Sequence, residues 1–100
     1  MKKTICVFCG SRHGANLEWT DLAGLLGKGI AERDWGLVFG GGGSGLMGAV
    51  ANAALKYKGH VTGIIPQGLT TEEPVINNLT ELHIVKTMRE RKEMMDNLSD

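Results

Sequence analysis

A cluster of glycines constrains the fold of this chain more than any other feature of its sequence. Five of the six residues from Gly40 to Gly45 are glycine, and they join a short apolar run to a segment with helical spacing. Glycines let a backbone turn sharply and approach a ligand, and the free amide groups at a helix start favour an anion. The pattern predicts a strand-to-helix loop that binds a nucleotide or another phosphate-bearing ligand. The alternative is that the glycines only pack the helix close to the sheet.

Apolar runs and helical patterns alternate along the rest of the chain. The apolar runs are continuous, which predicts strands covered on both faces and therefore a parallel sheet. They lie at residues 4–9, 36–39, 60–65 and 82–85, and helical spacing is seen at 21–30, 46–55 and 88–98. This order predicts right-handed βαβ units and an α/β, Rossmann-like doubly wound parallel sheet, truncated after about four strands. Ligands of such sheets bind at the carboxyl ends of the strands.

The charge balance and the N-terminus exclude several classes of protein. Eleven basic residues balance eleven acidic ones, so no large field favours nucleic acid or an anionic membrane, and we expect neither as a partner. No run approaches the roughly 18 apolar residues of a membrane span. The first ten residues lack the longer apolar stretch of a signal peptide. We therefore expect a cytoplasmic protein.

Two common interpretations of a glycine-rich loop do not fit this one. The pattern Gly-x-Gly-x-x-Gly occurs twice, from Gly40 and from Gly43. A Walker loop, however, needs lysine and Ser/Thr after its last glycine, and Leu46 follows Gly45. A dinucleotide site expects an acidic residue at the tip of the next strand, and residues 65–68 contain none. A different kind of phosphate-bearing ligand is therefore expected.

Two cations in the last helical segment share the side that should face the sheet. At about 100° per residue, Arg91 and Lys92 lie close to the stripe of Met88 and Met95, whereas Arg89 points away. Two cations near a helix start also oppose the helix dipole, so an anionic group should compensate them. Ligand binding is the favoured interpretation, and snorkelling or a structural ion pair is the alternative.

Other polar residues at the same edge of the sheet are weaker candidates. Glu72 and Glu73 follow the third strand, where an exposed acidic loop is an equally simple explanation. Ser11 follows the first strand and could donate to a phosphate or ribose, although serine after glycine is common in turns. Cys6 and Cys9 form a C-x-x-C pair, but in a strand residues i and i+3 face opposite sides, so packing explains them better than metal or redox chemistry.

Three segments together resemble the LONELY GUY (LOG) family of phosphoribohydrolases. These are residues 7–11, the run Gly-Gly-Gly-x-x-Gly-Leu-Met-Gly that ends at Gly48, and Met-x-x-Arg-Lys at residues 88–92. The match covers the whole chain in order. Some members are labelled "possible lysine decarboxylase", but no pyridoxal phosphate lysine can be identified, and neither a cofactor nor a metal is expected.

The resemblance implies hydrolysis of the N-glycosidic bond of a cytokinin riboside 5′-monophosphate, or of AMP, giving free base and ribose 5-phosphate. Arg91 matches the family's catalytic arginine, Lys92 the adjacent binding residue and Glu73 a substrate-contacting glutamate. A carboxylate suits an oxocarbenium-like sugar, and a cation can hold the phosphate or assist departure of the base. Together, the residue patterns and the resemblance give an expected substrate-binding set of Ser11, Gly41, Gly42, Gly43, Glu73, Met88, Arg91 and Lys92.

One part of the family pattern is missing. The motif Pro-Gly-Gly-x-Gly-Thr-x-x-Glu, which would supply the main phosphate cradle and a catalytic glutamate, should follow beyond Asp100. We therefore expect residues 1–100 to be the N-terminal portion of a single nucleotide-binding domain, inactive alone and a homodimer when complete. A non-catalytic module of Rossmann-like fold that binds or carries a nucleotide or the molybdenum cofactor is the alternative.

Overall fold

The computed structural model describes residues 3–7, 17–41, 45–69 and 78–99. The chain forms strands β1 (Thr4–Cys6), β2 (Gly36–Phe39), β3 (His60–Pro66) and β4 (Glu81–Val85), which pair in parallel in the order β1-β2-β3-β4. The helices are α1 (Leu17–Glu32), α2 (Gly45–Lys56) and α3 (Met88–Leu98), with a 3-10 turn η1 at Gln67–Leu69. The predicted α/β class and parallel sheet are confirmed.

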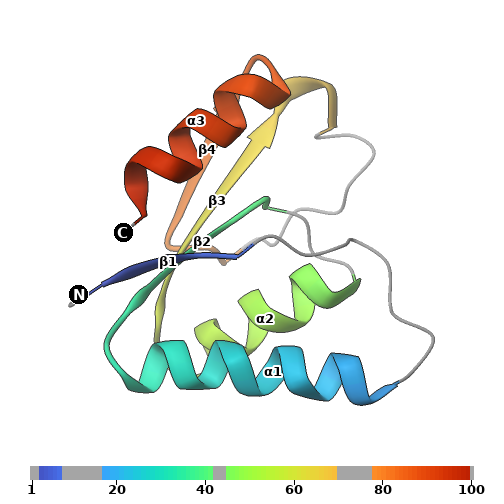
Figure 1. Ribbon diagram of the computed structural model, residues 1–100, viewed down its shortest axis with the longest axis vertical. Helices are drawn as coiled ribbons and strands as arrows, with labels where there is room; N and C mark the ends of the chain where they lie inside the picture. The colour runs from blue at the N-terminus through green and yellow to red at the C-terminus, as the bar shows by residue number, and fades with distance from the viewer. Residues whose placement is uncertain (1–2, 8–16, 42–44, 70–77, 100) are drawn as a thin grey trace.

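The helices lie on both faces of the sheet. Helices α1 and α2 cover one face, and α3 covers the other (Figure 1). Because side chains alternate along a strand, neighbouring residues of β2 supply two different cores. Leu37 and Phe39 pack with α1 and α2, whereas Val38 packs with Ile64 and Met95 beneath α3. The sheet is therefore buried on both sides, which explains why its sequence runs are continuously apolar.

The first two helices end in the same way. Asp34 and Lys58 adopt left-handed backbone conformations, with φ of 58° and 64°. The amide of Trp35 donates to the carbonyl of Ile30 at 3.1 Å, and that of Gly59 donates to Ala54 at 2.8 Å. These are the hydrogen bonds of a Schellman motif, which satisfies the last helical carbonyls and turns the chain. Each helix is thereby followed directly by the next strand.

The buried face of α1 is not the one that carries most of its leucines. The helix predicted from the helical spacing at residues 21–30 is present, but Leu22 and Leu25 are 61% and 62% exposed, whereas Gly27 and Ile30 are buried. The physical reason is the contact with α2, which the small Gly27 permits at short range. None of the helices among residues 17–41, 45–69 and 78–99 combines the length and apolar character that a membrane crossing requires.

Candidate functional site

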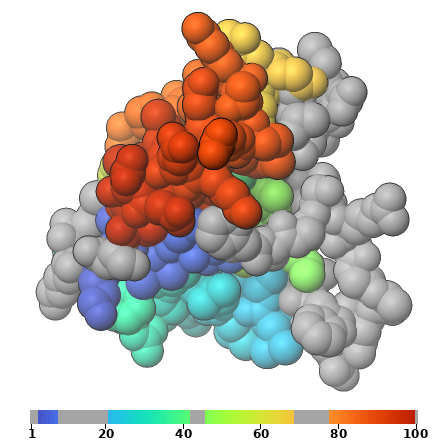
Figure 2. Space-filling model, turned by 45° about the horizontal axis from the view of Figure 1, so that its top comes forward, coloured from blue at the N-terminus to red at the C-terminus, as the bar shows by residue number. Residues whose placement is uncertain are grey.

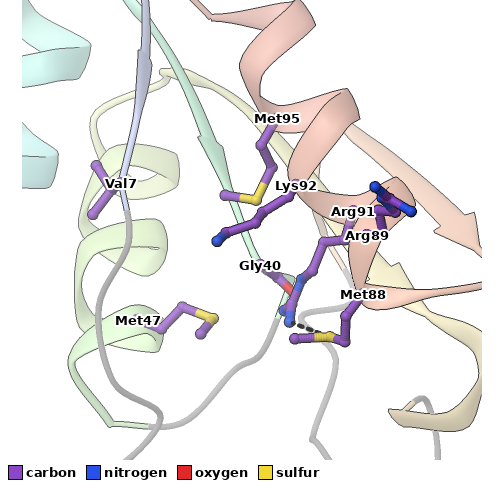
Figure 3. Close-up of a pocket in the computed structure, with 8 residues that line it drawn as sticks. All are labelled: Val7, Gly40, Met47, Met88, Arg89, Arg91, Lys92 and Met95. Atoms are coloured by element: carbon purple, nitrogen blue, oxygen red, sulfur yellow. Dashed lines mark hydrogen bonds between the residues drawn. The ribbon is translucent and has the colours of Figure 1, made fainter.

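A cavity of about 570 Å³ opens where the carboxyl end of β2 meets the helices on both faces of the sheet (Figure 3). Its volume lies within the usual range of ligand pockets. In the space-filling view, α3 (red) lies above β1 (blue) (Figure 2). Most of the described residues that line the cavity belong to α3, so this helix forms one of its walls. The described residues that line it are Val7, Gly40, Met47, Met88, Arg89, Arg91, Lys92 and Met95.

The start of α3 is fixed by its own residues. Thr87 is the N-cap, and its hydroxyl accepts a hydrogen bond from the amide of Glu90 at 3.1 Å. The Glu90 carboxylate accepts from the amide of Lys86, also at 3.1 Å. The first bond satisfies an amide group that a helix start leaves without a partner, and the second ties the residue before the N-cap to the first turn. An acidic side chain in the first turn also favours the helix dipole. The first turn of α3 is thus held at the edge of the sheet where ligands are expected.

Arg91 extends from this turn toward the carboxyl ends of β2 and β3. Its side chain is largely buried, with 9% exposure. The Nε atom donates to the carbonyl of Ile64 at 2.8 Å, and one terminal nitrogen donates to the carbonyl of Gly40. The other terminal nitrogen contacts the Met88 sulfur at 3.6 Å (Figure 3). Main-chain carbonyls therefore supply part of the compensation that a cation in this position requires.

The neighbours of Arg91 behave as the helix spacing predicts. Lys92 lines the cavity, and its side chain extends toward Val7, whereas the Arg89 side chain turns outward (Figure 3). Arg89 is 90% exposed and reaches Glu93 at 4.0 Å. An exposed pair of this kind contributes about 0–1 kcal/mol. Arg91 and Lys92 thus bring their side chains to the cavity together with Met88, whereas Arg89, which also lines it, directs its charged end outward.

Apolar side chains line the cavity next to these cations and opposite them. Val7 follows β1, Met47 lies in the first turns of α2, and Met95 lies one helical turn beyond Arg91. Thioether side chains are polarisable and pack well against flat rings. The sequence singled out Met95 only as a helix-phase marker, and it did not predict that Val7 or Met47 lines the site. The Leu-Met-Gly ending of the glycine run was the available signal for Met47.

The other predicted site residues divide into two groups. Gly41 is buried at the end of β2 with φ of 85°, a conformation that favours glycine, but it does not line the cavity. Ser11, Gly42, Gly43 and Glu73 lie outside the described residues. The same holds for Cys9, whereas Cys6 ends β1 and is partly buried. Burial, together with the nearby Asp96 carboxylate, raises the pKa of the Cys6 thiol, although a hydrogen bond with Ser99 opposes this shift.

The fold and the site together define a Rossmann-like α/β protein with a basic cavity at the carboxyl ends of its strands. Residues 47–100 match the model of the family described as "possible lysine decarboxylase". The chain belongs to this family, and the resemblance to LOG proteins is confirmed by its curated relatives.

Two curated relatives illustrate the match. The cytokinin riboside 5′-monophosphate phosphoribohydrolase of Rhodococcoides fascians is 43% identical over 99 residues, which cover 98% of this chain and 50% of that protein. The probable cytokinin riboside 5′-monophosphate phosphoribohydrolase LOG4 of Oryza sativa subsp. japonica is 44% identical over 98 residues, covering 98% of this chain and 43% of that protein. The chain thus spans half or less of the length of these relatives.

Solved structures share the fold at lower identity. The X-ray structure of TM1055 superposes with a TM-score of 0.74 at 22% identity, covering 100% of this chain and 58% of that one. The molybdenum cofactor carrier protein of Chlamydomonas reinhardtii gives a TM-score of 0.62 at 19% identity, covering 98% and 85%. At these identities, the two structures support the Rossmann-like architecture alone.

Proposed function

We propose that the full-length protein hydrolyses the N-glycosidic bond of a nucleoside 5′-monophosphate to free base and ribose 5-phosphate. The observation that carries this proposal is the position of Arg91, a largely buried guanidinium at the edge of a cavity that Lys92 also lines. Relatives at 43% and 44% identity are named as phosphoribohydrolases of cytokinin riboside 5′-monophosphates. These names make a cytokinin riboside 5′-monophosphate the substrate to test first, and we propose AMP as a second one.

The cavity offers different surroundings to the two ends of such a substrate. Arg91 and Lys92 suit the 5′-phosphate or the departing base, because charge-assisted hydrogen bonds to such groups are stronger than neutral ones. The apolar wall of Val7, Met47 and Met95 suits the flat, weakly polar base. We therefore place the ribose between the cations and the methionines, with the scissile bond in the cavity.

The proposed reaction also needs a carboxylate. Cleavage passes through an oxocarbenium-like sugar, which a nearby carboxylate stabilises. None of the described residues that line the cavity is acidic. We assign this role to Glu73, as the substrate contact, and to a catalytic glutamate of the family's second motif. We also propose that the complete protein is a cytoplasmic homodimer that works without a cofactor.

The direct test is incubation of the full-length protein with AMP and with isopentenyladenosine monophosphate. Chromatography should show free adenine or isopentenyladenine together with ribose 5-phosphate, and Arg91→Ala should abolish most of this release. Recovery of both nucleotides intact from a protein that binds them would instead support the non-catalytic binding or carrier alternative. Absence of both binding and release would contradict the proposal as a whole.

A further inference from the structure

We propose that Gly40 is a positioning residue for Arg91, because the missing side chain at residue 40 leaves the space that the guanidinium occupies. This inference deepens the proposed function, in which Arg91 contacts the substrate. The sequence suggested only that the glycine cluster approaches a ligand. The structure indicates that its first member approaches another part of the same protein, 51 residues further along the chain.

The surroundings of Gly40 carry the inference. A β-carbon built on Gly40 would have its three nearest neighbours in one side chain, that of Arg91. It would overlap a terminal nitrogen and lie 2.9 Å from Cζ and 3.3 Å from Nε. Real β-carbons essentially never approach other heavy atoms within 3.0 Å. Any residue larger than glycine therefore displaces the guanidinium from this position.

Backbone conformation does not explain the glycine at residue 40. Among the described glycines, the positive φ belongs to Gly41, at 85°, and not to Gly40. An alanine at residue 40 is therefore compatible with the backbone, whereas the same change at residue 41 is strained. Glycine therefore occupies the two adjacent positions for different physical reasons. Gly41 is required by its backbone conformation, and Gly40 leaves space for the side chain of Arg91.

The same contacts predict that a substitution disturbs the site more than the fold. The atoms that an alanine would meet are the far end of a flexible side chain, which can move without shifting a strand. Movement would break the alignment of Nε with the Ile64 carbonyl and of the terminal nitrogen with the Gly40 carbonyl. Displacements of about 1 Å in a catalytic geometry can cost on the order of 10²-fold in rate.

The first measurement needs no substrate. In full-length protein labelled with ¹⁵N, the Nε–H resonance of Arg91 is assigned by its loss in Arg91→Lys. We expect this proton to exchange slowly in the unsubstituted protein, because it donates to the buried Ile64 carbonyl. Gly40→Ala should shift the resonance and speed its exchange. Gly68→Ala is the matched control, because a β-carbon there meets no heavy atom of the described residues within 4 Å.

The second measurement uses turnover of AMP. Gly40→Ala should lower kcat/KM by roughly 10²-fold, with Gly68→Ala close to the unsubstituted protein. In an Arg91→Ala background, Gly40→Ala should lower kcat/KM almost no further, because the effects of two substitutions are not additive when one residue acts through the other. Thermal unfolding of the same four proteins gives a double-mutant cycle for stability. Any loss of Tm caused by Gly40→Ala should disappear in the Arg91→Ala background.

Three results would overturn the inference. They are an unchanged Arg91 Nε–H resonance in Gly40→Ala, losses of kcat/KM that multiply across the two substitutions, and an equal loss of Tm with and without Arg91. If the unsubstituted protein shows no turnover, the proposed function fails, while the resonance and the unfolding cycle still decide whether Gly40 positions Arg91.

Discussion

Arg89 and Arg91 lie on opposite sides of α3, although one residue separates them in the sequence. The Arg89 side chain is exposed and pairs with Glu93, whereas Arg91 is buried against the carbonyls of Gly40 and Ile64. An exposed charge is solvated with or without its partner, so little depends on it. A buried guanidinium held by two strand ends has a fixed position, which is what a substrate-binding cation requires.

This contrast predicts different kinetic effects for the two arginines. In the full-length protein, Arg91→Ala should lower kcat/KM for AMP by roughly 10²–10³-fold, the scale of losing one electrostatic transition-state contact. Arg91→Lys should recover only part of the loss, because lysine keeps the charge but not the planar fork. Arg89→Ala is the control and should change kcat/KM little. Equal losses for both alanine variants would contradict the contrast between the two sides of α3, and an unchanged kcat/KM in Arg91→Ala would exclude a catalytic role for Arg91.

A second prediction concerns recognition of the phosphate by Lys92. Since Lys92 lines the cavity, Lys92→Gln should weaken binding of AMP while leaving adenosine binding unchanged. A partly exposed charge pair is worth about 1 kcal/mol, so we expect roughly a fivefold loss that shrinks at high salt. Calorimetry with both ligands measures this, and Lys56→Gln, at the far end of α2, is the control. Equal weakening of AMP and adenosine would argue against a phosphate contact.

The sequence predicted well those elements in which buried residues follow a regular pattern along the chain. Continuous apolar runs indicated the parallel strands because both faces of the sheet are covered. The 100° spacing placed Arg91 inward and Arg89 outward on α3, since that helix packs along one stripe. These predictions depend on local periodicity, which a single sequence contains.

What the sequence could not predict depends on contacts between distant residues. The outward leucines of α1 were unexpected, because apolar spacing assumes that the largest apolar side chains face the core. Gly27 faces inward because the backbone of α2 approaches it closely, a contact that the sequence of α1 alone does not indicate. Likewise, the different roles of Gly40 and Gly41 depend on where Arg91 lies, 51 residues away from Gly40.

A third prediction concerns Cys6. Burial and the Asp96 carboxylate raise the pKa of its thiol, so at neutral pH the thiolate, which is the reactive form, is scarce. In a Cys9→Ser background, alkylation of Cys6 by iodoacetamide should therefore be slow at pH 7 and should rise only above the ordinary thiol pKa of 9.0. The rate of a small model thiol is the reference. Faster reaction than the model thiol at pH 7 would show an activated cysteine instead.

The same cysteine is not expected to take part in turnover. Asp96 disfavours the thiolate, and Cys6 lies at the end of β1 outside the set of residues that line the cavity. Cys6→Ala combined with Cys9→Ser should leave kcat/KM within a few-fold of the unsubstituted protein. Metal analysis of both proteins accompanies the kinetics, and loss of stoichiometric zinc in the double variant would contradict the interpretation of this pair as strand packing.

The last prediction compares two glycines of α1 that lie three residues apart. A β-carbon at Gly27 would overlap the Val50 carbonyl of α2 and approach the Ala53 β-carbon and the Ala54 amide nitrogen, both at 3.0 Å. A β-carbon at Gly24 would meet no atom within 4 Å in the part of the chain that the structure describes. Alanine in place of glycine inside a helix normally stabilises by about 0.5–1 kcal/mol, because it restricts the unfolded chain. Gly24→Ala should show this gain in chemical denaturation.

Gly27→Ala should show the opposite sign, because the backbone of α2 cannot move away as a flexible side chain would. Overpacking of this kind costs about 1–3 kcal/mol, which exceeds the gain in helix propensity. The free energy of unfolding should therefore fall for Gly27→Ala and rise for Gly24→Ala, with unchanged m-values for both. If the two variants were equally stabilised, the close contact between α1 and α2 through Gly27 would be wrong, and with it the explanation of the outward-facing leucines.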